Sequence, residues 1–198
     1  MRPVSWIVVA LLLLSAWHLY SQRDIGQVAG VLAAQEPDQQ QIDGAAGIEH
    51  GTFLLRPRAD FNATVRVLAR EEYSVGDFAT LVPTDFAVGW GPMSDSAILE
   101  DIEISQRNRF YYWRTDSWPL SREEIERHSA NWHVIAGSES VRATLERLRA
   151  GSIVELRGQL VDIEGREGDM RTSLSRRDTG AGACEILLAS SARVIEAR

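Results

Sequence analysis

The chain has 198 residues, 44% of them hydrophobic and 25% charged, a composition typical of one folded domain with additional segments and not of a disordered chain. Its formal net charge is −7, and an acidic chain without a basic stripe argues against nucleic acid as a partner, because such binding depends on neutralising phosphates. The single cysteine, Cys184, excludes an internal disulfide and a cysteine-rich zinc site.

The amino-terminal segment 4–20 is almost entirely apolar, and 17 helical residues extend about 26 Å, close to the thickness of a hydrocarbon core. Trp6 lies near one end and Trp17 and Tyr20 near the other, as expected of interfacial aromatic residues. The alternative is a cleaved signal peptide, but no small-x-small cleavage motif directly follows the apolar run. The sequence therefore predicts one transmembrane signal anchor within residues 1–21.

The charges flanking this segment predict its orientation. Arg2 lies on the amino-terminal side, whereas Arg23 is offset by Asp24 on the other side. The positive-inside rule then places the amino terminus in the cytoplasm and the rest of the chain outside. In a Gram-negative host this means a single-pass protein of the inner membrane with a periplasmic domain. Residues 22–47, polar and rich in Gln and Gly, read as a linker.

The remaining residues, 48–198, form one predicted α+β domain. Residues 61–74 begin with alternating apolar residues on one face, as expected of a strand. Two short helical pieces are expected next: the first is capped by Thr84 and ends near Gly89 and Gly91, and the second is capped by Ser94 or Ser96. Residues 109–115 form an aromatic strand.

A clear helix start follows. Ser121 and Glu124 have the spacing of a reciprocal capping box, so a helix is expected from Ser121 to about His128. Residues 131–136 then read as a short strand, with Trp132 and His133 on opposite faces. Residues 138–150 form an amphipathic helix that ends at Gly151.

The last part of the chain is predicted to be all strand. Residues 153–165 form a long strand with a bulge or bend at Gly158, residues 170–174 a second strand, and residues 184–197 two closing strands. A long bent strand with a hairpin partner resembles the OB-fold, a small Greek-key barrel. The expected fold is a mixed or antiparallel OB-like barrel or coiled sheet with flanking helices. Its OB-like strands lie mainly in 151–198, completed by residues 61–70 and 109–115.

Three separated stretches of sequence, VPTDFAVGWGPMSDS, HSANWHVI and DTGAGACEILL, resemble those of a group of bacterial proteins. Members of this uncharacterised family have one amino-terminal membrane segment and an external domain. The resemblance extends over most of residues 61–190. It implies a bacterial origin and the topology described above, and it implies no activity, cofactor or catalytic residue.

Two histidines, His128 and His133, raise the question of a zinc site that they would form with Cys184 and Glu185. Metal-binding pairs on one helix are spaced three or four residues apart, whereas these two are five apart and straddle a helix end and a strand start. A histidine in the last turn of a helix also has an ordinary structural role there. We therefore expect no metal site and no cofactor, and a structural role for His128.

Cys184 is a weak candidate nucleophile. Together with His133 and either Asn131 or Asp178 it has the residue types of a cysteine–histidine–carboxamide or carboxylate arrangement. It also opens an apolar strand, where an unpaired cysteine is often a small buried hydrophobic residue. The sequence alone therefore does not decide between a catalytic and a structural role for Cys184.

Two groups of residues are weak candidates for ligand binding. Arg176 and Arg177 lie in a Gly-rich loop, residues 175–183, that either cradles an anion or only connects strands. Asn131 and Trp132 belong to a set of polar and aromatic residues that either line a groove or pack in the core. The other aromatic residues of this set are Trp90, Tyr111, Tyr112, Trp113 and Trp118.

The sequence favours a membrane-anchored envelope domain that binds a small ligand or a protein partner of the envelope. A second hypothesis is an envelope hydrolase that uses His133 with Cys184 or a nearby carboxylate. A third is a structural subunit of a membrane complex. The first two differ in one geometric respect: a hydrolase requires His133, Cys184 and a carboxylate such as Asp178 to converge beside an open cleft.

Overall fold

A computed structural model describes residues 8, 9, 12, 23–76, 78–166 and 168–195. The segment 4–20 predicted as a membrane anchor lies outside these residues, apart from residues 8, 9 and 12. Among the described residues, we find no helix with the length and apolar character needed to cross a bilayer.

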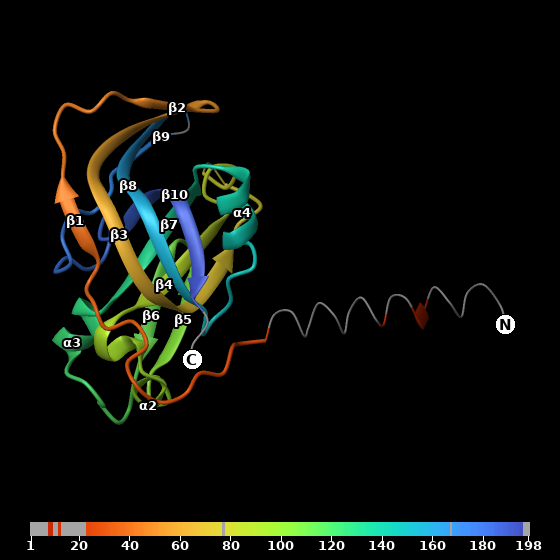
Figure 1. Ribbon diagram of the computed structural model, residues 1–198, viewed down its shortest axis with the longest axis vertical. Coiled ribbons are helices and arrows are strands. Elements are labelled where there is room, and N and C mark those ends of the chain that lie inside the picture. Colours follow the sequence, from red (N-terminus) through yellow and green to blue (C-terminus); the bar gives the residue numbers. More distant parts are fainter. Residues whose placement is uncertain (1–7, 10–11, 13–22, 77, 167, 196–198) are drawn as a thin grey trace.

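The domain is α+β and consists mostly of strands (Figure 1). The strands are β1 (Asp38–Gln41), β2 (Ile48–His50), β3 (Phe53–Glu72), β4 (Thr84–Gly89), β5 (Glu103–Arg107), β6 (Phe110–Arg114), β7 (Ser129–Ala136), β8 (Ile153–Gly165), β9 (Gly168–Met170) and β10 (Glu185–Ile195). The helices are a 3-10 turn η1 (Gly91–Ser94), α2 (Ser96–Leu99), α3 (Arg122–Arg127) and α4 (Glu139–Leu145).

Five strands pair in a closed circuit. β3 pairs with β4, β4 with β7, β7 with β10, β10 with β8, and β8 again with β3. Only the β7–β10 pair of this circuit is parallel. Figure 1 shows β3 and β8 curving side by side along the length of the molecule. The expectation of a barrel or strongly coiled sheet is thereby confirmed at the level of architecture.

The barrel encloses the main apolar core. Alternate residues of β3 point inward, because successive side chains of a strand face opposite sides; these are Phe61, Ala63, Val65 and Val67, as the sequence predicts. Trp132 packs against Phe61 with the rings edge to face, 5.3 Å apart. α4 covers one end of the barrel with Val141 and Leu145.

The helix start predicted from the capping box at Ser121 is confirmed. The Ser121 hydroxyl accepts a hydrogen bond from the Glu124 amide, and the Glu124 carboxylate accepts one from the Ser121 amide. Ser138 caps α4 by accepting from the Val141 amide. The short helix α2 is capped by Asp95, not by Ser94 or Ser96.

The predicted helix beginning at Thr84 is wrong, because residues 84–89 form strand β4. This strand pairs with β3 on one side and with β7 on the other, and five of its six residues are buried. A short, continuously apolar run of this kind fits a central strand and a buried helix equally well. The pairing partners, which are distant in sequence, decide between them.

We expected the aromatic strand 109–115 to complete the main sheet. Residues 110–114 instead form β6, which pairs with β5 in a separate two-stranded hairpin. Asn108 and Arg109 form its two-residue turn, and both have positive φ (55° and 68°). This is the backbone of a tight hairpin whose twist matches that of its strands. The hairpin packs over Met93, Ile102 and Ile125, a small cluster separate from the barrel core.

The carboxy-terminal strands differ from the prediction in two further respects. β8 is continuous through Gly158, and the register shifts lie in its neighbours, between Pro57 and Ala59 in β3 and between Ala189 and Ser191 in β10. Residues 184–197 supply one strand, β10, and residues 171–174 are irregular. Gly158 has a different role: a Cβ atom there would lie 2.0 Å from the Leu188 carbonyl oxygen, so the missing side chain lets the β10 backbone approach closely.

Part of the segment expected to be a linker packs against the domain. β1 pairs with β3, and Ala33 is 2% exposed, with its amide donating to the Ser94 hydroxyl. The Ile25 amide donates to the Ala150 carbonyl. The domain therefore extends further toward the amino terminus than residue 48.

Candidate functional site

A cavity of about 510 Å³ lies between the β5–β6 hairpin, α3, the start of β7 and the loop that precedes β10. Six aromatic side chains contribute to its wall, and we call it the aromatic cavity after them: Trp90, Phe110, Tyr111, Tyr112, Trp113 and Trp118. All of them except Phe110 belong to the set singled out in the sequence. Ligand sites commonly have this size and this mainly apolar lining.

Two polar groups in the wall of the aromatic cavity lack hydrogen-bond partners among the described residues. They are Oε2 of Glu185 and Nε1 of Trp90, and their side chains are buried. Burial raises the pKa of the Glu185 carboxyl to about 8, with Asp178 adding to the rise and Arg176 and His133 opposing it. Burial thus favours the protonated form of Glu185 at neutral pH, and both Oε2 of Glu185 and Nε1 of Trp90 are enclosed behind the cavity surface, out of contact with solvent.

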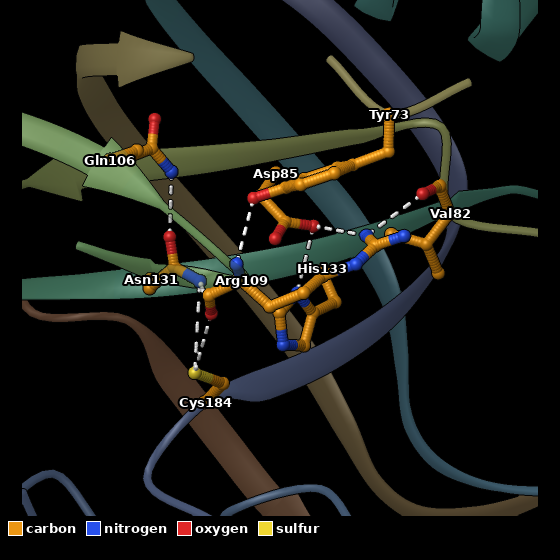
Figure 2. A network of polar contacts seen from close by, with 8 residues as sticks. All are labelled: Tyr73, Val82, Asp85, Gln106, Arg109, Asn131, His133 and Cys184. Carbon is orange, nitrogen blue, oxygen red and sulfur yellow. Dashed lines mark hydrogen bonds and ion pairs between the residues drawn. The ribbon is translucent and has the colours of Figure 1, made fainter. Parts of the chain in front are cut away.

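Behind Cys184, at the edge of this cavity, lies a buried histidine–carboxylate pair. β4 and β7 place Asp85 directly opposite His133, and Nδ1 of His133 lies 2.8 Å from Oδ1 of Asp85. The histidine is 3% exposed and the aspartate 0%. In Figure 2 the second ring nitrogen of His133 is turned away from Asp85, toward the side where Cys184 lies.

Arg109 holds the aspartate from the other side. Its Nη1 donates to Oδ1 of Asp85 at 2.9 Å and to the carbonyl of Val82 at 2.9 Å. Its guanidinium stacks 3.9 Å from the ring centroid of Tyr73, whose hydroxyl accepts from the Arg109 amide. The positive φ of Arg109 in the hairpin turn thus places a cation beside the buried carboxylate.

The charge on His133 follows from these neighbours. Burial of the ring disfavours the protonated form, but hydrogen bonds with Asp85 and Cys184 and the charges of both outweigh it, and they raise the pKa of His133 from 6.5 to about 9. At neutral pH the ring is an imidazolium, with one N–H directed to Asp85 and the other available to Cys184.

Asn131 connects the hairpin to Cys184. Its Nδ2 donates to the carbonyl of Arg109 at 3.0 Å and lies 3.7 Å from the Cys184 sulfur (Figure 2). Its Oδ1 accepts from Nε2 of Gln106 at 2.7 Å. Since Asn131 and Cys184 also line the aromatic cavity, the polar network reaches the cavity wall at these two residues.

The structure brings together some of the predicted site residues and separates others. His133, Cys184 and Asn131 are neighbours, whereas Asp178 accepts a hydrogen bond from Ser173 and takes no part in the histidine pair. Trp132 belongs to the barrel core. Arg176 lines the cavity and donates to the carbonyl of Pro37 at 2.7 Å, and Arg177 is exposed and absent from the cavity wall.

Sequence reasoning missed the roles of three residues of the site: it did not name Asp85 or Arg109, and it considered Glu185 only as a possible zinc ligand. Sequence reasoning placed Asp85 at the start of a helix, and a helical residue would not lie opposite His133 in a pair of strands. Recognising residues 84–89 as a strand next to 129–136 would have placed Asp85 opposite His133. Arg109 and Glu185 gave no comparable local signal, since their roles depend on a turn conformation and on burial.

The structure also bears on the metal question. Within the described ranges, no three histidine, cysteine or acidic side chains are grouped closely enough to hold a metal ion. His128 lies at the end of α3, where its Nδ1 is 2.8 Å from the Glu124 carbonyl oxygen. This is the helix-terminal role expected of it.

Comparisons with protein-family models, curated proteins and solved structures found no match for this chain.

Proposed function

We propose that this protein is a membrane-anchored domain of the bacterial envelope that binds a small ligand in its aromatic cavity. The membrane anchor is the segment 4–20, and the domain is periplasmic, as the flanking charges indicate. A concave, mainly apolar cavity of about 510 Å³ favours a small molecule over a protein partner, whose contact surfaces are larger and flatter.

We further propose that the domain is OB-like. Numbered along the chain, the five barrel strands pair in the order 1-2-3-5-4 and back to 1, with the third and fifth parallel. A helix, α4, lies between the third and fourth strands. A five-stranded Greek-key barrel that binds ligands on one face has this layout.

The aromatic lining of the cavity carries the binding proposal, and two unpartnered polar atoms enclosed behind it support the proposal. Buried polar groups are almost always hydrogen-bonded, because leaving one unpaired costs on the order of 1–3 kcal/mol. Oε2 of Glu185 and Nε1 of Trp90 gain partners when a small shift of the surrounding side chains admits complementary groups of a ligand. The ligand class is therefore a planar, mainly apolar molecule that has both a hydrogen-bond donor and an acceptor.

Benzamide has this chemistry and serves as the probe. We expect saturation-transfer NMR with the full-length protein in detergent micelles to show binding of benzamide but not of acetamide, which lacks the ring. Trp118→Ala should weaken binding about tenfold, equivalent to about 1.4 kcal/mol, because an exposed aromatic wall is lost.

Arg142→Ala is the matched control, since Arg142 lies on α4, away from the aromatic cavity. It should leave benzamide binding unchanged. The binding proposal fails if neither benzamide nor substituted aromatic amides bind the wild-type protein, or if Trp118→Ala and Arg142→Ala bind benzamide equally well.

A further inference from the structure

Cys184 lies between the aromatic cavity and the buried His133–Asp85 pair. Its side chain contributes to the cavity wall and is half-buried, while His133 and Asp85 are absent from that wall. The order from the cavity inward is thus thiol, imidazole, carboxylate. This order places the one thiol of the chain where a bound molecule can meet it.

In cysteine-dependent enzymes, the same order of thiol, imidazole and carboxylate activates the cysteine as a nucleophile. A carboxylate that binds one ring nitrogen of a histidine directs the other nitrogen toward the thiol, and the resulting imidazolium stabilises a thiolate. Here the Nδ1–Oδ1 distance of 2.8 Å fixes the ring, and Arg109 fixes the carboxylate. On its other side the Cys184 thiol donates to the Arg109 carbonyl at 3.9 Å and accepts from Nδ2 of Asn131 at 3.7 Å, so that deprotonation of the thiol breaks the first of these contacts and keeps the second.

A purely structural role accounts for less of this arrangement. A buried ion pair is weak evidence for stability, because desolvation offsets much of the attraction. A structural pair also has no need to end on a sulfur that faces a cavity. One branch of the polar network extends from Tyr73 through Arg109, Asp85 and His133 to Cys184, and of these five residues Cys184 is the one that lines the cavity.

We propose that Cys184 is the nucleophile of an acyl-transfer activity, in which it attacks the carbonyl carbon of an ester or thioester bound in the aromatic cavity. His133 is the proton donor and acceptor, and Asp85 and Arg109 are positioning residues. The inference rests on the proposed function only for the place where the acyl compound binds.

The chemistry balances as follows. The Cys184 thiolate forms a C–S bond to the carbonyl carbon, the bond to the leaving group breaks, and the leaving alcohol or thiol takes the proton carried by His133. Water then attacks the thioester carbon and gives a proton to His133. The carboxylic acid departs, and the thiolate–imidazolium pair is restored without any change in oxidation state.

Other charged and titratable groups face this pair. They are Glu185 on β10, Arg176 and Asp178 in the preceding loop, and Arg109 and Tyr73 near the hairpin turn. Glu185→Gln keeps the shape of its side chain, so it can be used to separate the titration of Glu185 from that of His133.

Alkylation by iodoacetamide tests the nucleophile directly. The sulfur displaces iodide from the methylene carbon, and because the chain has one cysteine, every alkylated molecule reports on Cys184. We expect the full-length protein at pH 7 to react at least about tenfold faster than His133→Gln or Asp85→Asn. His50→Gln, a histidine outside the network, should react like the wild type.

Equal alkylation rates for the wild type and a folded His133→Gln variant overturn the proposal. If circular dichroism shows that both network variants unfold, the wild type alone decides: at pH 6 the folded protein should react faster than the same protein in guanidinium chloride. A slower reaction of the folded protein overturns the inference.

p-Nitrophenyl acetate tests the acyl-transfer step. We expect release of p-nitrophenolate together with one acetyl group on Cys184 in acid-quenched protein, detected by mass spectrometry, and both signals should disappear in Cys184→Ser. Unchanged release in that variant overturns the proposal. Benzamide binding and iodoacetamide reactivity are separate readouts, so failure of the binding proposal is distinguishable from failure of the nucleophile.

Discussion

Nδ1 of His133 lies 2.8 Å from Oδ1 of Asp85, and both side chains are excluded from solvent. The two residues face each other directly across the β4–β7 pairing, so the register of two central strands sets their separation. Arg109, from the hairpin turn, binds the same carboxylate oxygen. The pair therefore links the barrel to the hairpin that forms part of the cavity wall.

This pairing predicts that stability falls at alkaline pH. The pKa of His133 is about 9 in the folded protein and 6.5 when unperturbed, so the folded state binds the proton more tightly. The stabilisation is fully present below pH 6.5 and is lost as the pH rises through 9. A shift of this size corresponds to roughly 3 kcal/mol. Urea unfolding at pH 6, 8 and 9.5 measures it.

His133→Gln provides the comparison, because it removes the titrating group and keeps a polar side chain. Between pH 8 and 9.5 the variant should lose much less stability than the wild type. Equal losses in the two proteins over this interval would show that the folded-state pKa of His133 is not raised.

The buried carboxyl group of Glu185 should cause a second change of stability with pH, at lower pH than the change due to His133. Burial raises the pKa of its carboxyl from 4.5 to about 8, so folding favours the protonated form. The wild type should therefore lose stability as the pH rises from 4.5 to 8, by at most roughly 5 kcal/mol. Glu185→Gln cannot ionise, so its stability relative to the wild type should increase from pH 5 to pH 8.

Thermal unfolding of both proteins at pH 5, 6.5 and 8 measures this difference. Glu126→Gln is a suitable control, because Glu126 also lines the cavity but is not buried. A constant stability difference between Glu185→Gln and the wild type across these pH values would contradict the account of the buried carboxyl.

Asp162 should contribute strongly to stability. It is 2% exposed and accepts hydrogen bonds from Nη1 of Arg58 at 2.6 Å, Nη1 of Arg171 at 3.0 Å and the Thr172 amide at 3.0 Å. Asp162→Ala leaves these donors without their shared acceptor and should cost about 3 kcal/mol in urea unfolding.

Glu103→Gln removes a carboxylate from an exposed ion pair with Arg114, in which both side chains are more than half exposed. It should cost less than about 1 kcal/mol, because solvent screens such pairs. The account of the Asp162 cluster is wrong if the two substitutions destabilise the protein equally.

Gly158 should not tolerate alanine. A Cβ atom there would lie 2.0 Å from the carbonyl oxygen of Leu188, a backbone atom of the paired strand β10. Gly158→Ala should therefore separate β8 from β10 and cost about 3 kcal/mol or prevent folding. Gly26→Ala, where no atom lies within 4 Å of the added Cβ, should change stability by less than about 0.5 kcal/mol in the same assay.

Local patterns in the sequence predicted the elements that depend on local physics. The capping box at Ser121 depends on residues three positions apart, so the start of α3 is visible in the sequence. The alternation from Phe61 to Val67 likewise shows which face of β3 enters the core. His128 was understood for the same reason, since its partner Glu124 lies one turn away.

The site depends on contacts between residues far apart in sequence. Asp85 and His133 are brought together by strand pairing, and Arg109 reaches them only because of the positive φ in its turn. The pairing of β3 with β8, which closes the barrel, also joins distant segments. Sequence reasoning therefore named His133 and Cys184 together but chose Asp178 as the carboxylate, where the fold supplies Asp85.

The most direct test of the account is the rate at which iodoacetamide alkylates Cys184 in the full-length protein as benzamide is added. If the aromatic cavity binds the ligand beside Cys184, the rate falls with benzamide concentration toward a plateau, and Trp118→Ala shifts the midpoint to a higher concentration. A rate that stays constant up to the solubility limit of benzamide would contradict the claim that the cavity beside Cys184 is the binding site.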